Sequence, residues 1–186
     1  MRIISGDYKG KNLFLAENNL TRPLKDLVKE SIFNIINHSS IFNLEIKNSI
    51  VLDLFSGTGS FGLECHSRGA KEVFFFENYT NALKILKKNI SHLKISNNYI
   101  IYDKDCFDYF RKNKKFETKF DIIFIDPPYK EKKINELLEN IIEKKILKKK
   151  GIIIIHRHKK DNVKITDKIN IIDTRYYGIS KIIFAN

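Results

Sequence analysis

The sequence predicts an α/β protein built on a doubly wound, mostly parallel β-sheet, and two observations lead to that class. From Ser49 onward, short apolar runs alternate with stretches of helical periodicity. That alternation is typical of a parallel sheet buried on both faces. Residues 169–186 instead contain two apolar runs on either side of Tyr177 and Gly178, which predicts a closing antiparallel hairpin.

The first forty residues follow a different pattern. The runs "RIIS" and "KNLFLA" flank the segment "GDYKGK", whose two glycines favour an N-terminal β-hairpin. Pro23 suits the first turn of a helix that starts near Thr21 or Arg22, and an apolar stripe continues to Ile36. We therefore expect a small hairpin and helix over residues 1–40 and the main domain over residues 41–186.

The alternating region predicts five strands and four helices. The expected strands are 50–55, 72–77, 98–102, 120–126 and 151–156, and the expected helices are 59–69, 80–93, 105–112 and 133–147. Gly69 can end the first of these helices, and Thr80 or Asn81 can cap the second. In such sheets ligands bind beyond the carboxyl ends of the strands, so the residues that end each strand are the candidate site.

Composition restricts the class of protein and its partners. The chain has 186 residues, 42% of them hydrophobic, which is enough for one domain with a substantial core. No long apolar run predicts a membrane span or a signal peptide, and two cysteines are too few for a disulfide scaffold, so we expect a cytoplasmic protein. The net charge of +12 favours nucleic acid, although an AT-rich coding bias would also supply its many lysines.

A glycine loop follows the first of the alternating strands. Gly57-x-Gly59-x-x-Gly62 satisfies the dinucleotide fingerprint, and Glu77 stands twenty residues after Gly57. Asp53, however, ends the strand beside this loop, where a carboxylate would repel a diphosphate. The arrangement suits a ligand with a cationic group and no phosphate, such as S-adenosylmethionine.

Two further acids stand at the ends of the next two strands. Glu77 can accept hydrogen bonds from ribose hydroxyls, and Asp105 can accept one from an adenine amino group. Cys106 and Phe107 could pack beside that ring. Asp105 is also a good N-cap for the helix that follows it, and the two roles are compatible.

The segment "DIIFIDPPYK" ends the fourth strand, which we expect beside the first. Asp126 and the carbonyl of Pro127 can accept hydrogen bonds from an exocyclic amino group, and the prolines stiffen the turn. Tyr129 offers a face on which a base can stack. The alternative is an ordinary β-turn with a surface tyrosine.

The motifs "DLFSGTGSFGLE" and "DIIFIDPPY" resemble those of S-adenosylmethionine-dependent amino-methyltransferases of nucleic acids. "MRIISGDYKGKNL" and "TRPLKDLVKESIFNII" sharpen the likeness to the RsmD family. The resemblance implies a Rossmann-like methyltransferase with a seven-stranded sheet. It also implies transfer of a methyl group, without a metal, to the N2 amino group of a guanine in 16S ribosomal RNA. We expect a monomer that acts on a small-subunit assembly.

The resemblance also implies the roles of particular residues. The cofactor-binding set is Asp53, Phe55, Ser56, Gly57, Thr58, Gly59, Glu77, Asn78, Asp105 and Cys106; the catalytic set is Asp126, Pro127, Pro128 and Tyr129; and the RNA-binding set is Lys9, Lys11, Arg22 and Tyr129. The N-terminal hairpin would help to hold the RNA. Asn78 stands where the family often has an acid.

One segment departs clearly from the family pattern. His156, Arg157 and His158 follow the fifth alternating strand, where the family usually has an acidic patch. Here they predict either a phosphate contact or a solvated tip.

Three other functions fit parts of the pattern. A DNA adenine-N6 methyltransferase would share the site but would need room for a sequence-reading insertion. An oxidoreductase that binds NAD would use the glycines but leave "DPPY" unexplained. A non-catalytic RNA-binding module would not need Asp53, Glu77 and Asp126 together.

Overall fold

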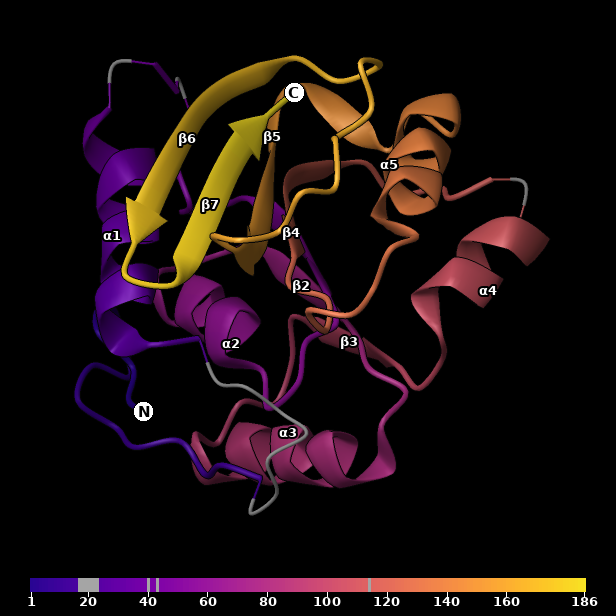
Figure 1. Ribbon diagram of the computed structural model, residues 1–186. Helices are drawn as coiled ribbons and strands as arrows, with labels where there is room; N and C mark the ends of the chain where they lie inside the picture. The colour runs from indigo at the N-terminus through magenta and orange to yellow at the C-terminus, as the bar shows by residue number, and fades with distance from the viewer. Residues whose placement is uncertain (17–23, 40, 43, 114) are drawn as a thin grey trace.

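A seven-stranded sheet forms the middle layer of the computed structural model, which describes residues 1–16, 24–39, 41–42, 44–113 and 115–186 (Figure 1). The strand order is β3-β2-β1-β4-β5-β7-β6. The strands are β1 Ile50–Leu54, β2 Glu72–Phe76, β3 Tyr99–Tyr102, β4 Phe120–Ile125, β5 Leu147–His158, β6 Ile171–Tyr177 and β7 Ser180–Ala185. β1 to β5 are parallel, and β7 pairs antiparallel with both β5 and β6. The predicted fold class is confirmed, with β4 beside β1.

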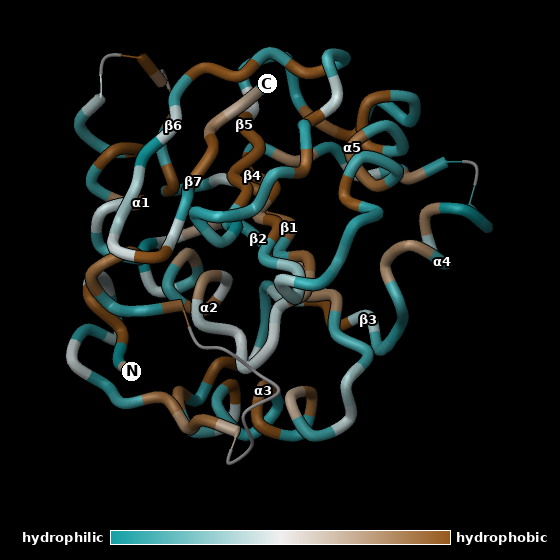
Figure 2. Tube along the Cα trace, in the orientation of Figure 1, coloured by the Kyte–Doolittle hydropathy of each residue, from teal (hydrophilic) through white to brown (hydrophobic). Residues whose placement is uncertain are grey.

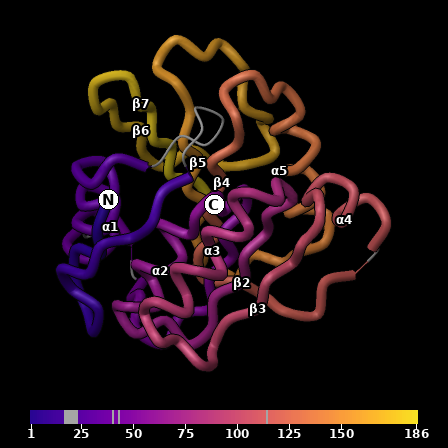
Figure 3. The backbone as a smooth tube through the Cα atoms, turned by 90° about the horizontal axis from the view of Figure 1, so that it is seen from below, coloured from indigo at the N-terminus to yellow at the C-terminus, as the bar shows by residue number. Residues whose placement is uncertain are grey.

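Helices cover both faces of the sheet, as Figure 3 shows from below. The helices are α1 Asp26–His38, α2 Ser60–Ser67, α3 Thr80–His92, α4 Cys106–Lys112 and α5 Ile134–Glu143. The buried side chains of α1, α2 and α3 share one core cluster with residues such as Phe75, and those of α4 and α5 share a second with Phe74 and Phe76. Successive strand residues thus supply opposite faces, which is why the strands read as continuous apolar runs.

Several boundaries differ from those that the sequence predicts. β5 runs from Leu147 to His158 rather than over 151–156, because Leu147 pairs with Phe120 and β7 pairs with its far end. α3 begins at Thr80 after Tyr79, and no side chain caps it, so the predicted cap is wrong. α1 is described from Asp26, and its expected start near Thr21 or Arg22 falls outside the described residues.

The N-terminal hairpin is present only in reduced form. A single bridge pairs Arg2 with Asn12, rather than two strands. Ile3 and Leu13 are buried in the core cluster that also contains Phe61 of α2, so this segment packs against the main sheet layers. A boundary at residue 40 stays a prediction.

Figure 2 shows the hydropathy of this arrangement, with the most apolar backbone in the central strands and polar stretches on the outer loops. Within the described ranges, no helix has both the length and the apolar character needed to cross a membrane.

Candidate active site

The carboxyl ends of β1 and β4 lie side by side and bring the two predicted motifs together. Leu54 pairs with Ile125, and the backbone N–H of Asp126 donates to the carbonyl of Leu54 over 3.4 Å. Asp53 and the glycine loop therefore lie next to the DPPY turn. This is the edge of a parallel sheet at which ligands bind.

Asp53 is a buried carboxylate, 1% exposed, that faces the start of α2. Its Oδ2 accepts a hydrogen bond from the Gly62 N–H over 2.9 Å. Burial raises the pKa of this carboxyl well above its usual range. The hydrogen bond from Gly62 lowers the pKa, and the negative charges of Asp126 and Glu77 raise it. A cationic ligand would relieve this unfavourable charge, which is the chemistry expected for S-adenosylmethionine.

The glycine loop leaves room for a ligand at one glycine and packs tightly at another. Gly57 and Gly59 have φ of +56° and +87°, and a Cβ built at Gly57 would meet no heavy atom within 4 Å. A Cβ built at Gly62 would come within 2.3 Å of the Phe75 ring. Gly62 therefore permits close packing of α2 on β2, while Gly57 permits approach by a ligand.

The remaining loop residues hold the backbone in place. The Ser56 hydroxyl donates to the carbonyl of Asp53 over 2.7 Å, and the Thr58 carbonyl accepts from the Asn89 side chain over 2.9 Å. Phe55 has a φ of +61°, and its ring packs 5.7 Å from that of Phe107. The predicted loop residues are thus supports for the loop conformation as well as candidate ligand contacts.

Glu77 braces the glycine loop from the end of β2. Its Oε2 accepts from the Gly57 N–H and its Oε1 from the Tyr79 N–H, each over 2.7 Å. Burial raises the pKa of this carboxyl, and the backbone hydrogen bonds oppose that shift. Each oxygen keeps a second lone pair, so the expected acceptance from two ribose hydroxyls is still possible.

Asp105 and Asn78 join the ends of β3 and β2. Asp105 caps α4, because its Oδ1 accepts from the Asp108 N–H over 3.0 Å, and the N-cap prediction is confirmed. Its Oδ2 accepts from the Asn78 side chain over 3.1 Å. Cys106 and Phe107 are buried behind this pair in the second core cluster.

The DPPY turn uses part of its own hydrogen-bonding capacity. The Pro128 carbonyl accepts from the Glu131 N–H over 2.8 Å, and the Tyr129 carbonyl lies 3.5 Å from a guanidinium nitrogen of Arg157. Of the hydrogen-bond acceptors in this turn, the Asp126 carboxylate and the Pro127 carbonyl are therefore the best candidates to meet an amino group. Pro127 is buried, whereas Asp126 and Tyr129 are half-buried.

The segment after the fifth alternating strand is not a solvated tip, and a phosphate contact there stays a prediction. His156 and Arg157 are 7% and 2% exposed, because β5 continues through them and pairs with β7. His156 Nδ1 lies 2.9 Å from Asp126 Oδ1. Sequence reasoning missed this partner of Asp126, and the only signal was the departure from the family's acidic pattern.

Arg157 points to the opposite side of β5 and ties two loops together. Its Nη2 donates to the Glu131 carbonyl over 2.8 Å, and its Nε donates to the Asp161 carboxylate. The turn that carries Tyr129 is thereby joined to the loop after β5.

Of the expected RNA-binding residues, Tyr129 lies at this edge in the DPPY turn, whereas Lys9 lies in the N-terminal turn, near the other end of α2. The Asp7 N–H donates to the carbonyl of Ser67, which holds the turn carrying Lys9 against the last residue of α2, whereas the glycine loop lies at the first. Lys9 and Lys11 are exposed, and contact with RNA stays a prediction for both. Arg22 lies outside the described residues.

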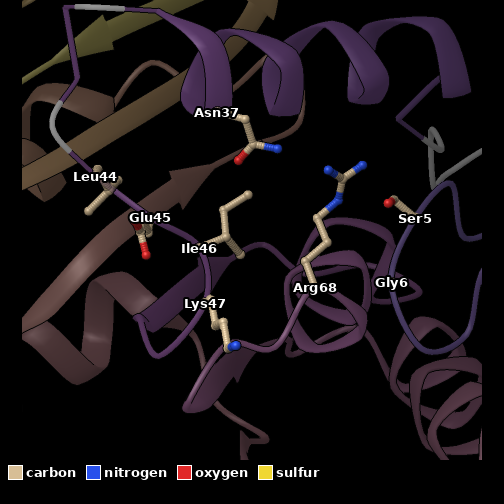
Figure 4. Close-up of a pocket in the computed structure, with 8 residues that line it drawn as sticks. All are labelled: Ser5, Gly6, Asn37, Leu44, Glu45, Ile46, Lys47 and Arg68. Atoms are coloured by element: carbon tan, nitrogen blue, oxygen red, sulfur yellow. The ribbon is translucent and has the colours of Figure 1, made fainter.

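A cavity of about 370 Å³ lies elsewhere, between the N-terminal loop, α1 and the segment before β1 (Figure 4). Ser5, Asn37, Lys47 and Arg68 are among the residues that line it. Lys47 precedes β1, so the cavity opens at the amino ends of the strands, away from Asp53 and Asp126. We therefore place the candidate site at the strand ends and not in this cavity.

Comparison with known proteins agrees with these motifs. A family model described as "Conserved hypothetical protein 95" matches residues 1–186. The chain is 36% identical over 164 residues to the Ribosomal RNA small subunit methyltransferase D of Buchnera aphidicola subsp. Acyrthosiphon pisum, covering 87% of this chain and 80% of that protein. The protein of the same name from Haemophilus influenzae is 32% identical over 160 residues, covering 86% and 79%.

Solved structures show the same fold. A Haemophilus influenzae protein described as a "putative methylase" is 29% identical with a TM-score of 0.77, covering 99% of this chain and 96% of that one. A structure described as "a putative methyltransferase complexed with SAH" has a TM-score of 0.64 and 20% identity. It covers 84% of this chain and 48% of that one. Because the family model matches residues 1–186 and these relatives are more than 30% identical, the chain belongs to the RsmD family of ribosomal RNA methyltransferases.

Proposed function

We propose that this protein transfers a methyl group from S-adenosylmethionine to the exocyclic N2 amino group of a guanine in 16S ribosomal RNA. The observation that carries the proposal is the pairing of β1 with β4, which sets Asp53 and the glycine loop beside Asp126 and the DPPY turn. A methyl donor held by the first motif and an amine held by the second would meet in one crevice. The names of the curated relatives support the substrate class.

The residues at the end of β1 fit S-adenosylmethionine better than a dinucleotide. Asp53 would hold the cationic methionine part, Gly57 would let the backbone approach the ligand, and Glu77 would accept from the ribose. Asp105 would accept from the adenine amino group. When bound, this cofactor supplies a methyl group on a sulfonium, so that a C–S bond breaks as the N–C bond forms.

The residues at the end of β4 act on the amine. Asp126 and the Pro127 carbonyl accept hydrogen bonds from the two amino hydrogens, which fixes the nitrogen lone pair toward the donor. Asp126 is also the carboxylate beside the proton that the amine must lose. Stacking of the base on Tyr129 contributes about 1–3 kcal/mol, and alignment supplies much of the acceleration.

A direct assay tests the proposal. Labelled S-adenosylmethionine is incubated with the protein and, in separate reactions, with small ribosomal subunits lacking modification, naked 16S RNA, total tRNA and duplex DNA. Each nucleic acid is then digested to nucleosides. We expect label in N2-methylguanosine from the small-subunit RNA, and little label with an Asp126→Ala protein. The subunit and naked-RNA reactions together identify the form of RNA that is the substrate.

The same assay separates the rival functions. Label in N6-methyladenine from DNA would keep the site but overturn the substrate. Unimpaired transfer by Asp126→Ala would overturn the role of the DPPY turn. An oxidoreductase that binds NAD is disfavoured, because Asp53 would be a buried negative charge beside the diphosphate.

A further inference from the structure

We propose that His156, itself held by Ser180, is a positioning residue that fixes the Asp126 carboxylate for the methyl acceptor. The bond from His156 occupies Oδ1 of Asp126, so Oδ2 is the oxygen that meets the amino group. The contact of Oδ2 with an amino group rests on the proposed function, whereas the hydrogen bonds of His156 do not.

The three side chains form a continuous chain of hydrogen bonds. His156 Nδ1 lies 2.9 Å from Asp126 Oδ1, and His156 Nε2 lies 2.9 Å from Ser180 Oγ. Both contacts have the length of good hydrogen bonds. Because both ring nitrogens are engaged, the imidazole plane is fixed at two points, and the carboxylate that it contacts is restrained in turn.

The chemistry of the partners selects the tautomer of His156. A carboxylate only accepts hydrogen bonds, so the bond to Asp126 requires a proton on Nδ1. In a neutral ring Nε2 then accepts from the Ser180 hydroxyl, which can donate. Asp126 therefore selects the ring form in which Nδ1–H points at it, and the Ser180 hydroxyl fits that form by donating to Nε2.

The exposed fractions of Ser180 and Asp126 show which end of this hydrogen-bond chain can contact a substrate. Ser, His and Asp also make up the hydrolase triad, in which an accessible serine attacks and a buried aspartate orients the ring. Here Ser180 is 5% exposed within β7, whereas the Asp126 side chain is 19% exposed at the sheet edge. The carboxylate, not the hydroxyl, is the member that a substrate can reach.

The strand pairing explains why these side chains meet. β7 lies directly beside β5, as Figure 1 shows, with Ser180 opposite His158. His156 and His158 are two residues apart, so both project from the same face of β5 as Ser180. The Tyr129 ring packs edge-on against both imidazoles, with its centroid 5.0 Å from that of His158 and 6.4 Å from that of His156.

Loss of the restraint is expected to slow methyl transfer while leaving the donor site intact. A misplacement of about 1 Å at a reacting centre can cost on the order of a hundredfold in rate. We therefore expect removal of the Nδ1–H donor to lower kcat by about tenfold to a hundredfold. The affinity for S-adenosylmethionine should not change, because Asp53 and the glycine loop are untouched.

Two amide substitutions at position 156 separate the two ends of the imidazole. The amide nitrogen of His156→Asn falls near the position of Nδ1 and can still donate to Asp126. That of His156→Gln falls near Nε2, so it keeps the contact with Ser180 and loses Asp126. We expect His156→Asn to retain most of the activity and His156→Gln to lose it, with exposed His38→Asn as the control.

A double-mutant cycle distinguishes positioning from a general effect on folding. If His156 acts through Asp126, His156→Gln should lower kcat in the wild type but add little to the residual activity of Asp126→Asn. An equal loss in both backgrounds would overturn the proposal, as would equal activity of His156→Gln and His156→Asn. Binding of S-adenosylmethionine, measured by calorimetry, should not change when His156→Gln is introduced into either background.

A second readout does not depend on turnover. Long-range nitrogen–proton NMR of the imidazole should show the Nδ1–H tautomer of His156 in the wild type, and mixed tautomers in Asp126→Asn, whose amide can both donate and accept. An Nε2–H tautomer in the wild type would overturn the inference. If the wild type transfers no methyl group to any nucleic acid, the proposed function fails, and the tautomer still decides the hydrogen-bond chain.

Discussion

At the scale of single residues, the buried carboxylate of Asp53 is unfavourable for folding, and its proposed role is to bind a cation. Burial holds its pKa well above the usual range of a carboxyl, so the native state binds a proton more tightly than the unfolded chain does. Stability from this group is therefore full below the unfolded pKa and is lost as pH rises through the folded one. A bound cation reverses this preference by stabilising the carboxylate.

Asp53→Asn should therefore stabilise the ligand-free protein and weaken binding of S-adenosylmethionine. The amide oxygen can still accept from Gly62, so the loop should keep its conformation. Loss of a charged contact predicts a fall in affinity of about tenfold to a hundredfold. Thermal unfolding and calorimetric titration near neutral pH measure the two effects. A less stable variant with unchanged affinity would contradict this account.

The raised pKa of Asp53 also predicts that binding of S-adenosylmethionine releases a proton. In the pH range between the ligand-bound and ligand-free pKa of Asp53, the carboxyl must ionise as the cation binds. Affinity should fall as pH decreases through the raised pKa. Calorimetry in buffers of different ionisation enthalpy measures the proton release, and Asp53→Asn should abolish it.

Two glycines of the loop should respond differently to substitution. Gly62→Ala would place a Cβ 2.3 Å from the Phe75 ring, so we expect overpacking to cost about 1–3 kcal/mol of stability. Gly57→Asn meets open space, and Asn tolerates a positive φ, so stability should change little while the side chain obstructs the ligand. Denaturant unfolding and ligand titration compare them. The reverse ranking would contradict the assigned roles.

At the scale of elements, the end of β5 contacts the DPPY turn and the residues after it from both faces of the sheet. His156 reaches Asp126 from one face, and Arg157, its neighbour in the strand, reaches the Glu131 carbonyl and Asp161 from the other. Alternation of side chains along a strand makes this possible. The DPPY turn is thus held by a strand that also pairs with β7.

Arg157→Met should loosen the DPPY turn without affecting the proposed S-adenosylmethionine site at Asp53 and the glycine loop. The substitution removes the bonds to Asp161 and to the Glu131 carbonyl, and a charged hydrogen bond contributes about 1.5–3 kcal/mol. We expect a loss of at least about 2 kcal/mol in stability and a higher KM for RNA. Arg157→Lys should recover only part of both, because one ammonium cannot replace the planar fork. Full recovery by lysine would show that charge alone matters.

At the scale of the whole molecule, the sequence predicts what depends on neighbours along the chain. β1 and β4 can be predicted because each is an apolar run, and Asp53 and Asp126 can be singled out because Asp53 interrupts the first run near its end and Asp126 directly follows the second. The partners of His156 could not be predicted in this way, since they lie 30 and 24 residues away and meet it only through strand pairing. Lys9 shows the same limit, because its distance from the glycine loop follows from where residues 6–8 pack on α2.

A buried charge network joins the N-terminal segment to the main domain. Glu64 of α2, with no exposed surface, accepts from the Ile4 and Ser5 N–H groups and from Arg68, and its carboxylate lies 3.4 Å from Lys29 Nζ of α1. Burial lowers the pKa of Lys29, against the attraction of Glu64. One carboxylate thus holds three parts of the fold together.

Glu64→Gln should uncouple these parts, because it leaves Lys29 buried without its main counter-charge. Breaking a buried pair in this way costs about 3–5 kcal/mol. A further fall in the pKa of Lys29 means that the unfolded chain binds more protons between the folded pKa and 10.5. The variant's stability should therefore rise with pH in that alkaline window more steeply than that of the wild type. Denaturant unfolding across this range measures the effect, and hydrogen exchange of the Ile4 and Ser5 amides should accelerate.

The double variant Glu64→Gln/Lys29→Met, which removes both charges, should be more stable than Glu64→Gln alone. A less stable double variant would show that packing of Lys29 outweighs its charge.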